Sequence, residues 1–222
     1  MKILFIGNSH TFFNDMPRLV SDMVKEATGE DCESVMLAYG GRSLKWHITE
    51  ERFAVRYNLL HGGYDYCVMQ EVAHPMTDEQ ETYENVRKIA DLCRKGGTVP
   101  VIFETWCERR MPEHQAEMNR RYHFIAEETG ALLAPIGEAW EKAGNAAGVD
   151  LYFRDGEHAS PAGDFLTALV ITKTVTGKTP DGSFRKAYDF ADPSGLFRLR
   201  EDAAEEVIEL PQETVDVFRS VI

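Results

Sequence analysis

Short apolar runs alternate with longer amphipathic stretches along most of the chain. The apolar runs are rich in Val, Ile, Leu, Tyr and Phe, and several are apolar on both faces, which is typical of buried parallel strands. Five runs are predicted to be strands: Lys2–Ile6, Glu33–Tyr39, Tyr64–Gln70, Thr98–Glu104 and Ala131–Pro135. The pattern therefore predicts a parallel sheet of about five strands.

Between the strands, apolar side chains recur at helical spacing. Four of these stretches are predicted to be helices: Pro17–Thr28, Asp78–Lys95, Glu113–Thr129 and Ile136–Ala147. A further helix follows the N-cap Ser160 and the N1 residue Pro161, and it should end before Gly177. This alternation predicts an α/β/α sandwich of three layers, and right-handed crossovers bring the carboxyl ends of all the strands to one edge.

The tail, residues 179–222, differs in composition from the rest of the chain: scattered Gly and Pro residues are followed by an acidic, helix-like segment. Its apolar positions are predicted to pack it against the sheet: Val207, Ile208, Leu210, Val215, Val217, Phe218 and Val221. No internal repeat, low-complexity segment or linker interrupts the chain. We therefore predict one domain over residues 1–222, with 179–222 as a C-terminal extension packed on it.

Composition and net charge argue against several classes of function. With 222 residues, 43% of them hydrophobic and 27% charged, the chain suits one globular domain, and no apolar run is long enough for a membrane helix. A net charge of −13 argues against nucleic-acid partners and against adhesion to anionic membranes. Met1 leads directly into an apolar strand without a cleavage signal, which predicts a cytoplasmic protein. The oligomeric state stays open.

Cysteine and histidine spacing gives no sign of a metal site. The four cysteines form no C-x-x-C pair and are predicted to be reduced, and the seven histidines show no zinc-binding spacing. We expect neither a metal nor a cofactor.

Two polar clusters are candidates for catalysis. Ser9 lies just beyond the first strand in "GNSHT", although a serine in such a loop more often caps a helix, and the segment lacks the G-x-S-x-G elbow. His158 lies in "DGEHASP", directly before a capped helix whose dipole favours a neutral imidazole. Asp155, three residues earlier, is placed to orient that imidazole, but a polar turn is the commoner explanation for this spacing.

Oxyanion donors are expected on two other loops. Gly40 and Gly41 follow the second strand, where the absence of a Cβ lets a backbone N–H approach a substrate oxygen, although a tight turn explains them equally. Gln70 and Glu71 end the third strand, and the Gln70 amide is a possible donor. Because all these loops share one edge of a parallel sheet, their joint placement favours acyl transfer.

These residues resemble the four sequence blocks of the SGNH hydrolases, also called GDSL-like lipases and esterases. The blocks here are "FIGNSHT", "YGGRSL", "VMQEVAHP" and "DGEHASPAG", which together span about residues 1–176. The resemblance implies a flavodoxin-like fold, Ser9 as nucleophile and Asp155 with His158 as acid and base. It also implies an oxyanion hole formed by Ser9, Gly41 and Gln70. Asn8 replaces the usual Asp of the first block, and Gln70 replaces the usual Asn of the third.

The resulting hypothesis is a serine esterase that hydrolyses acetyl or short acyl esters, with carbohydrate O-acetyl groups as one class. Further substrate contacts are predicted at Asn8, Gly40, Glu71 and Trp106. A lysophospholipase or thioesterase of the same superfamily is an alternative. So is a catalytically weak or inactive ligand-binding protein, motivated by Gln70. A nucleotide or phosphate binder is less favoured, because the loop after the first strand has no Lys or Arg.

Overall fold

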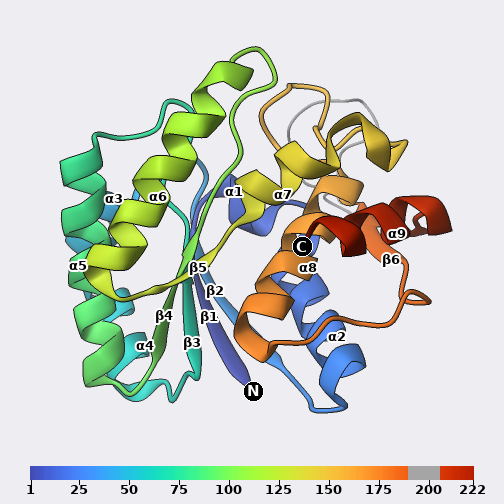
Figure 1. The fold of residues 1–222 in the computed structure, drawn as a ribbon. Helices are drawn as coiled ribbons and strands as arrows, with labels where there is room; N and C mark the ends of the chain where they lie inside the picture. The colour runs from blue at the N-terminus through green and yellow to red at the C-terminus, as the bar shows by residue number, and fades with distance from the viewer. Residues whose placement is uncertain (190–205) are drawn as a thin grey trace.

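The structure is a computed structural model that describes residues 1–189 and 206–222. Its centre is a five-stranded parallel sheet with the strand order β2-β1-β3-β4-β5 (Figure 1). The strands are β1 (Lys2–Gly7), β2 (Glu33–Ala38), β3 (Tyr66–Met69), β4 (Val99–Phe103) and β5 (Leu132–Ala134). Each lies within two residues of its predicted bounds, and the predicted three-layer α/β/α class is confirmed.

Alternate side chains of β1 enter two separate cores, as the period of a strand requires. Ile3 and Phe5 face one layer of helices, whereas Leu4 and Ile6 face the other, and all four are fully buried. The first layer contains α2 (Met16–Thr28), α7 (Ile136–Ala143) and α8 (Pro161–Thr176). The second contains α3 (Leu44–Thr49), α4 (Arg52–His61), α5 (Glu79–Lys95) and α6 (Gln115–Thr129). Figure 1 shows the two layers on opposite sides of the sheet.

Helices α3 and α4 were not predicted from the sequence. Ser43 caps α3 by accepting a hydrogen bond from the backbone N–H of Trp46. Leu44, Val55 and Leu59 bury the inner sides of the two helices against the second core. A Ser cap followed by apolar residues at helical spacing was the available signal. The predicted helix over 113–129 begins as a 3₁₀ turn (Pro112–His114), and the one over 136–147 ends as another (Gly144–Ala147).

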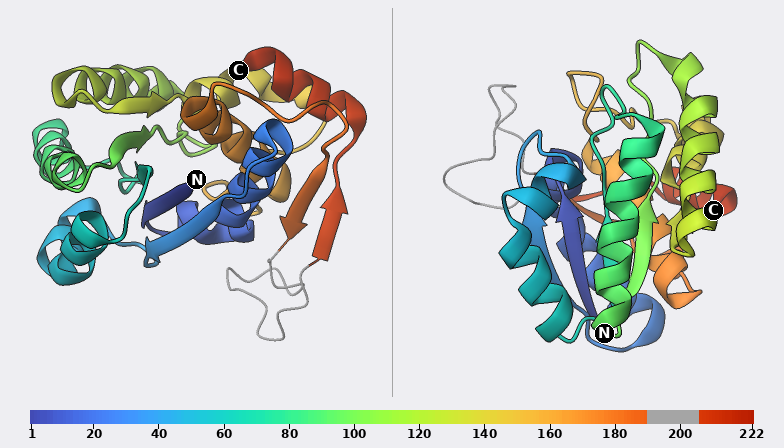
Figure 2. Two further views of the ribbon diagram at one scale, coloured as in Figure 1. Left: turned by 90° about the horizontal axis from the view of Figure 1, so that it is seen from below. Right: turned by 90° about the vertical axis from the view of Figure 1, so that its left-hand side faces the viewer.

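The tail forms an antiparallel strand pair, β6 (Lys186–Asp189) with β7 (Glu206–Glu209), followed by α9 (Gln212–Val221). Figure 2 shows this pair outside the main sheet, on the side of α2. Val215 and Phe218 of α9 are buried in the first core, where α9 packs on α7 and on the 3₁₀ turn after it. The predicted packing against the sheet is therefore wrong: the tail covers helices, and Val207 is 53% exposed.

Candidate active site

Ser9 is the first residue of the short helix α1 (Ser9–Phe12), immediately beyond β1. Asn8 is the N-cap, and its Oδ1 accepts a hydrogen bond from the His10 backbone N–H at 3.1 Å. A Cβ on Gly7 would lie 2.2 Å from Thr11 Oγ1, so only glycine fits at the end of the strand. This tight exit delivers Ser9 to the carboxyl edge of the sheet, where ligands bind in open α/β folds.

The structure brings Ser9, His158 and Asp155 into one hydrogen-bonded chain. The Ser9 Oγ lies 2.8 Å from His158 Nε2, and His158 Nδ1 lies 2.7 Å from Asp155 Oδ2. Because the carboxylate must accept from Nδ1–H, the Nε2 atom of the neutral ring is left to accept the serine proton. Two segments 149 residues apart in sequence thus meet with the geometry of a nucleophile, a base and an orienting acid.

The loop that carries His158 holds Asp155 in its ionised form. Burial alone would raise the pKa of this carboxyl group. Hydrogen bonds from the backbone N–H of Glu157, from the His158 ring and from the His158 N–H more than offset burial, so the pKa lies below its usual value. A negative carboxylate in this position is suited to stabilise a protonated imidazole beside it.

Two further histidines lie near His158: His10 is against its ring, His74 is against His10, and both have a lowered pKa. The His10 ring centroid lies 4.6 Å from that of His158, and the His74 ring lies 5.1 Å from His10. Burial, followed by the charges of His158 and His74, lowers the pKa of His10 well below its usual value. Burial lowers the pKa of His74 to about 4. Neither ring is thus a permanent cation near His158.

Gln70 is at the site but does not reach the open side of Ser9. Its side chain is fully buried, and its Oε1 accepts from the Asn8 backbone N–H at 2.9 Å and from the Thr11 hydroxyl at 3.2 Å. Its amide nitrogen donates to the Glu71 carbonyl. In this arrangement the Gln70 amide bonds to the Ser9 loop and to the Glu71 carbonyl, so it does not make the predicted donation to an oxyanion. Gln70 instead braces the loop that presents Ser9.

Asn8 and Glu71, two of the predicted substrate contacts, are buried, and their side chains bond to backbone. The Asn8 amide donates to the Arg42 carbonyl at 3.2 Å, which links the Ser9 loop to the loop after β2. Glu71 is 2% exposed, and its Oε1 accepts from the backbone N–H groups of Leu44 and Val72 at 3.0 and 2.8 Å. Burial raises the pKa of Glu71 to about 6.

Gly40 and Gly41 lie in an exposed loop at the same edge. Gly41 has φ +67, a conformation that favours glycine, and no neighbouring atom lies within 4 Å of where its Cβ would be. In the part of the chain that the structure describes, no hydrogen bond uses the backbone N–H of Ser9 or of Gly41. These two backbone donors are thus available to a ligand beside Ser9.

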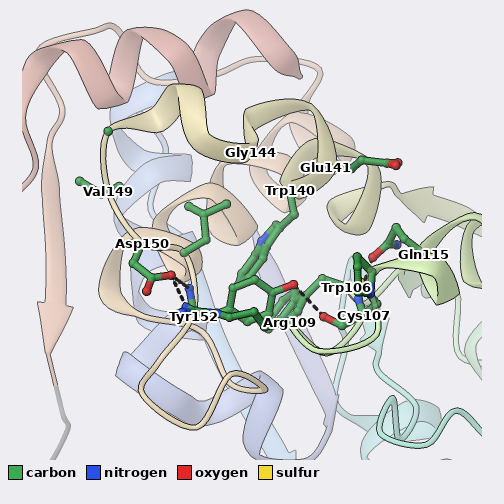
Figure 3. Close-up of a pocket in the computed structure, with 13 residues that line it drawn as sticks. Trp106, Cys107, Arg109, Gln115, Trp140, Glu141, Gly144, Val149, Asp150 and Tyr152 are labelled. Carbon is green, nitrogen blue, oxygen red and sulfur yellow. Dashed lines mark hydrogen bonds and ion pairs between the residues drawn. The ribbon is translucent and has the colours of Figure 1, made fainter.

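Trp106 lies behind the His158 loop and does not offer a ring to a substrate as predicted. It is fully buried and stacks on Trp140 with ring centroids 3.9 Å apart, and its Nε1–H donates to the Glu157 carbonyl at 2.8 Å. Trp106 also lines a pocket of about 610 Å³, together with Trp140 and Tyr152 (Figure 3). None of Ser9, Asp155 and His158 lines that pocket, so it is separate from the candidate catalytic residues.

The described residues contain neither a metal-binding cluster nor a membrane-spanning helix. Within residues 1–189 and 206–222, no group of three or more His, Cys, Asp or Glu side chains is arranged to hold a metal ion. Over the same residues, every helix is too short or too polar to span a bilayer.

Comparison with known structures identifies the family. A protein of Slackia heliotrinireducens assigned to the SGNH hydrolases is 31% identical, and the match covers 78% of this chain and 98% of that one with a TM-score of 0.68. TesA is 15% identical with a TM-score of 0.60, covering 80% and 99% of the two chains. An acetylxylan esterase of Geobacillus stearothermophilus is 14% identical with a TM-score of 0.62, covering 79% and 94%. No protein-family model matches the sequence, nor does any curated protein.

A serine, a histidine and an aspartate in hydrogen-bond contact at the carboxyl edge of a parallel sheet are the arrangement of a serine hydrolase. The extent of the match to the Slackia protein makes the family specific: this chain belongs to the SGNH hydrolases, which act on ester bonds.

Proposed function

We propose that this chain is a serine esterase in which Ser9, His158 and Asp155 form the catalytic triad. The observation that carries the proposal is the continuous hydrogen-bonded chain from Ser9 Oγ through both ring nitrogens of His158 to Asp155. His158 Nε2 takes the hydroxyl proton as Ser9 Oγ attacks the ester carbonyl. The same proton then passes to the departing alkoxide, and the ester C–O bond breaks to leave an acyl-enzyme.

Water completes the reaction through the same base. His158 removes a proton from water as the water oxygen attacks the acyl carbonyl, and it returns that proton to Ser9 Oγ as the acid leaves. The oxyanion formed in each step accepts hydrogen bonds from the backbone N–H groups of Ser9 and Gly41, which is supported by their freedom from internal acceptors among the described residues.

The proposed substrates are acetyl or short acyl esters, with O-acetylated carbohydrates as the first class to test. The structural likeness to an acetylxylan esterase supports this choice over longer acyl chains. A net charge of −13 is unfavourable for approach to anionic lipid surfaces, which disfavours a lysophospholipase. An acyl thioester remains the alternative within the same chemistry.

The test is Ser9→Ala, assayed on p-nitrophenyl acetate, on acetylated xylose oligomers and on p-nitrophenyl esters of increasing length. We expect turnover to fall to the background rate while the thermal midpoint changes little, because the substitution removes one oxygen from a residue that is already 6% exposed. Ser34→Ala is the matched control, since Ser34 lies on β2 and its hydroxyl bonds only Ser21 and Pro17.

A fluorophosphonate probe provides a second measurement, because it labels an activated serine even when the true substrate is unknown. Wild type and Ser34→Ala should be labelled, and Ser9→Ala should not. Wild-type turnover in Ser9→Ala, or a wild-type chain that resists labelling, would refute the proposed triad and favour a ligand-binding protein on the same fold.

A further inference from the structure

The segment that carries the nucleophile also encloses the base. His10 and Phe13 come from the same short stretch as Ser9, and both rings flank the His158 ring, with centroids 4.6 and 5.7 Å away. Phe13 is 1% exposed and also packs edge-on against Phe153, at 5.2 Å. The separation between Ser9 and His158 therefore depends on how this stretch is fixed against the His158 loop.

Asn14 fixes it at the point where the stretch turns. Its backbone is left-handed, with φ 48, and so is that of Asp15, with φ 50. Two consecutive non-glycine residues in this region are strained, and they persist only where the surroundings hold them. Asn14 is 1% exposed, and its single amide nitrogen donates to Ala159 O at 3.2 Å and to Asp164 Oδ2 at 2.8 Å.

Both acceptors belong to the segment that carries the base. Ala159 directly follows His158, and Asp164 lies in the first turn of α8, the helix that begins at the end of the His158 loop. Asp164 is fully buried, and within residues 1–189 and 206–222 its Oδ1 has no hydrogen-bond partner. Asn14 thus joins the end of the nucleophile stretch to the residue after His158 and to the helix that follows it.

A polar pair at this depth is not explained by stability alone. Burying a carboxyl group with one satisfied oxygen is costly, and apolar side chains of the same shape would usually be at least as stable. Elsewhere on α8 the buried positions are mostly apolar, such as Leu166 and Leu169, or carry an uncharged threonine. The pair therefore has a use that an apolar contact cannot supply, namely a directional link between two loops.

We propose that Asn14 and Asp164 are a positioning pair that sets the Ser9–His158 distance. The pair touches no substrate and acts through the two segments that it joins. This inference rests on the proposed triad, since it concerns the distance across which Ser9 gives up its proton. A displacement of about 1 Å between reacting groups is enough to cost roughly 100-fold in rate.

Three variants test the pair. Asn14→Gly removes the amide while keeping a residue that adopts a left-handed backbone without strain, and Asp164→Ala removes the acceptor. Asp164→Asn is the conservative variant, since its amide oxygen can still accept from Asn14. Thr172→Val is the matched control: Thr172 is buried further along α8, and its hydroxyl has no partner among the described residues.

The expected result is a selective loss of turnover. We expect Asn14→Gly and Asp164→Ala to lower kcat by roughly 10- to 100-fold while KM stays within about twofold, because the pair contacts no substrate. Asp164→Asn should restore most of the rate, and Thr172→Val should behave as wild type. If Asp164→Ala does not fold, Asn14→Gly alone decides. A lower melting temperature with unchanged kcat in Asn14→Gly would overturn the proposal and leave the pair a merely structural role.

A measurement that needs no turnover separates this proposal from the proposed function. The proton on His158 Nδ1, shared with Asp155, should give a low-field resonance in the proton NMR spectrum of the wild-type chain. Asn14→Gly should broaden or shift it, because the ring is no longer held, whereas Thr172→Val should not. If the wild type is inert to the fluorophosphonate, the triad proposal fails, and this resonance still decides the pair: an unchanged signal in Asn14→Gly rejects it.

Discussion

Side chains form one half of the active site, and the backbone forms the other. Ser9, His158 and Asp155 meet through side-chain atoms at 2.8 and 2.7 Å. The loop after β2 carries Gly41, whose N–H is a proposed donor, while the buried side chains of Gln70 and Glu71, after β3, bond to main chain. The two halves use polar residues for different tasks.

The difference shows where residue type reveals chemistry. A nucleophile, a base and an acid act through groups that only certain side chains carry, so their identities are visible along the chain. The proposed oxyanion donor on the other half is a peptide N–H, which every non-proline residue has. The polar side chains that accompany it keep that backbone in place. We expect substitutions on the first half to remove activity and those on the second half mainly to lower stability.

Gln70→Leu should produce the largest effect on the backbone half. The change leaves the buried Asn8 N–H and the Thr11 hydroxyl without their acceptor. At about 1–3 kcal/mol for each of the two buried groups that lose their partner, the free energy of unfolding should fall by about 2–6 kcal/mol. Activity per folded molecule should drop by less than roughly tenfold, the reverse of Ser9→Ala. Urea denaturation and kcat of the folded fraction provide the two measurements.

The opposite outcome for Gln70→Leu would break the comparison. A donor to the oxyanion is worth roughly 10²–10³ in kcat and its loss need not affect folding. Such a fall in kcat with unchanged stability would mean that the Gln70 amide turns outward when substrate binds. Gln80→Leu is the control, because Gln80 lies on the exposed side of α5.

Glu71 on one half and Asp155 on the other should contribute to stability with opposite dependence on pH. Its pKa is raised by burial from 4.5 to about 6, so the folded state holds the proton more tightly than the unfolded state. The stabilisation is fully present below about pH 4.5 and is lost as pH rises through about 6, at most about 2 kcal/mol in all. The pKa of Asp155 is lowered, so its contribution instead is lost as pH falls. In Glu71→Gln, the decrease in unfolding free energy between pH 4.5 and about 6 should be absent.

Unfolding free energies measured in steps from pH 4 to pH 7 test this prediction. Glu84→Gln is the control, since Glu84 is an exposed residue of α5. A difference in unfolding free energy between wild type and Glu71→Gln that stays constant from pH 4 to pH 7 would contradict the prediction. It would mean that the pKa of Glu71 is not raised in the folded protein.

How well the sequence predicts each feature depends on how far apart along the chain the residues that determine it lie. Strand bounds and the Ser160 cap follow from a few adjacent residues and are confirmed. The segments of Ser9 and His158 each carry a local pattern. The orientation of Gln70 depends on Asn8, 62 positions away, and the Asn14–Asp164 pair spans 150. No local pattern marks either, because a buried amide looks the same in sequence whichever partner it finds.

Trp106 offers the smallest and sharpest test, because its stacked neighbour is a built-in control. Both indoles are buried, but only the Trp106 Nε1–H donates to the Glu157 carbonyl, inside the loop between Asp155 and His158. Among the described residues, the Trp140 Nε1–H has no acceptor. Trp106→Phe and Trp140→Phe therefore remove the same ring portion and differ in one hydrogen bond, worth about 0.5–1.5 kcal/mol.

If that bond steadies the His158 loop, its loss should appear in kcat as roughly a two- to tenfold decrease in Trp106→Phe and as no comparable decrease in Trp140→Phe. Both variants should lose similar stability, because both leave a similar cavity beside the same stack. Steady-state kinetics on a short acyl ester and thermal melts suffice. Equal decreases in kcat for the two variants would show that the His158 loop depends on the packing of the Trp106–Trp140 stack. The hydrogen bond from Trp106 to Glu157 would then not be needed to support the proposed triad.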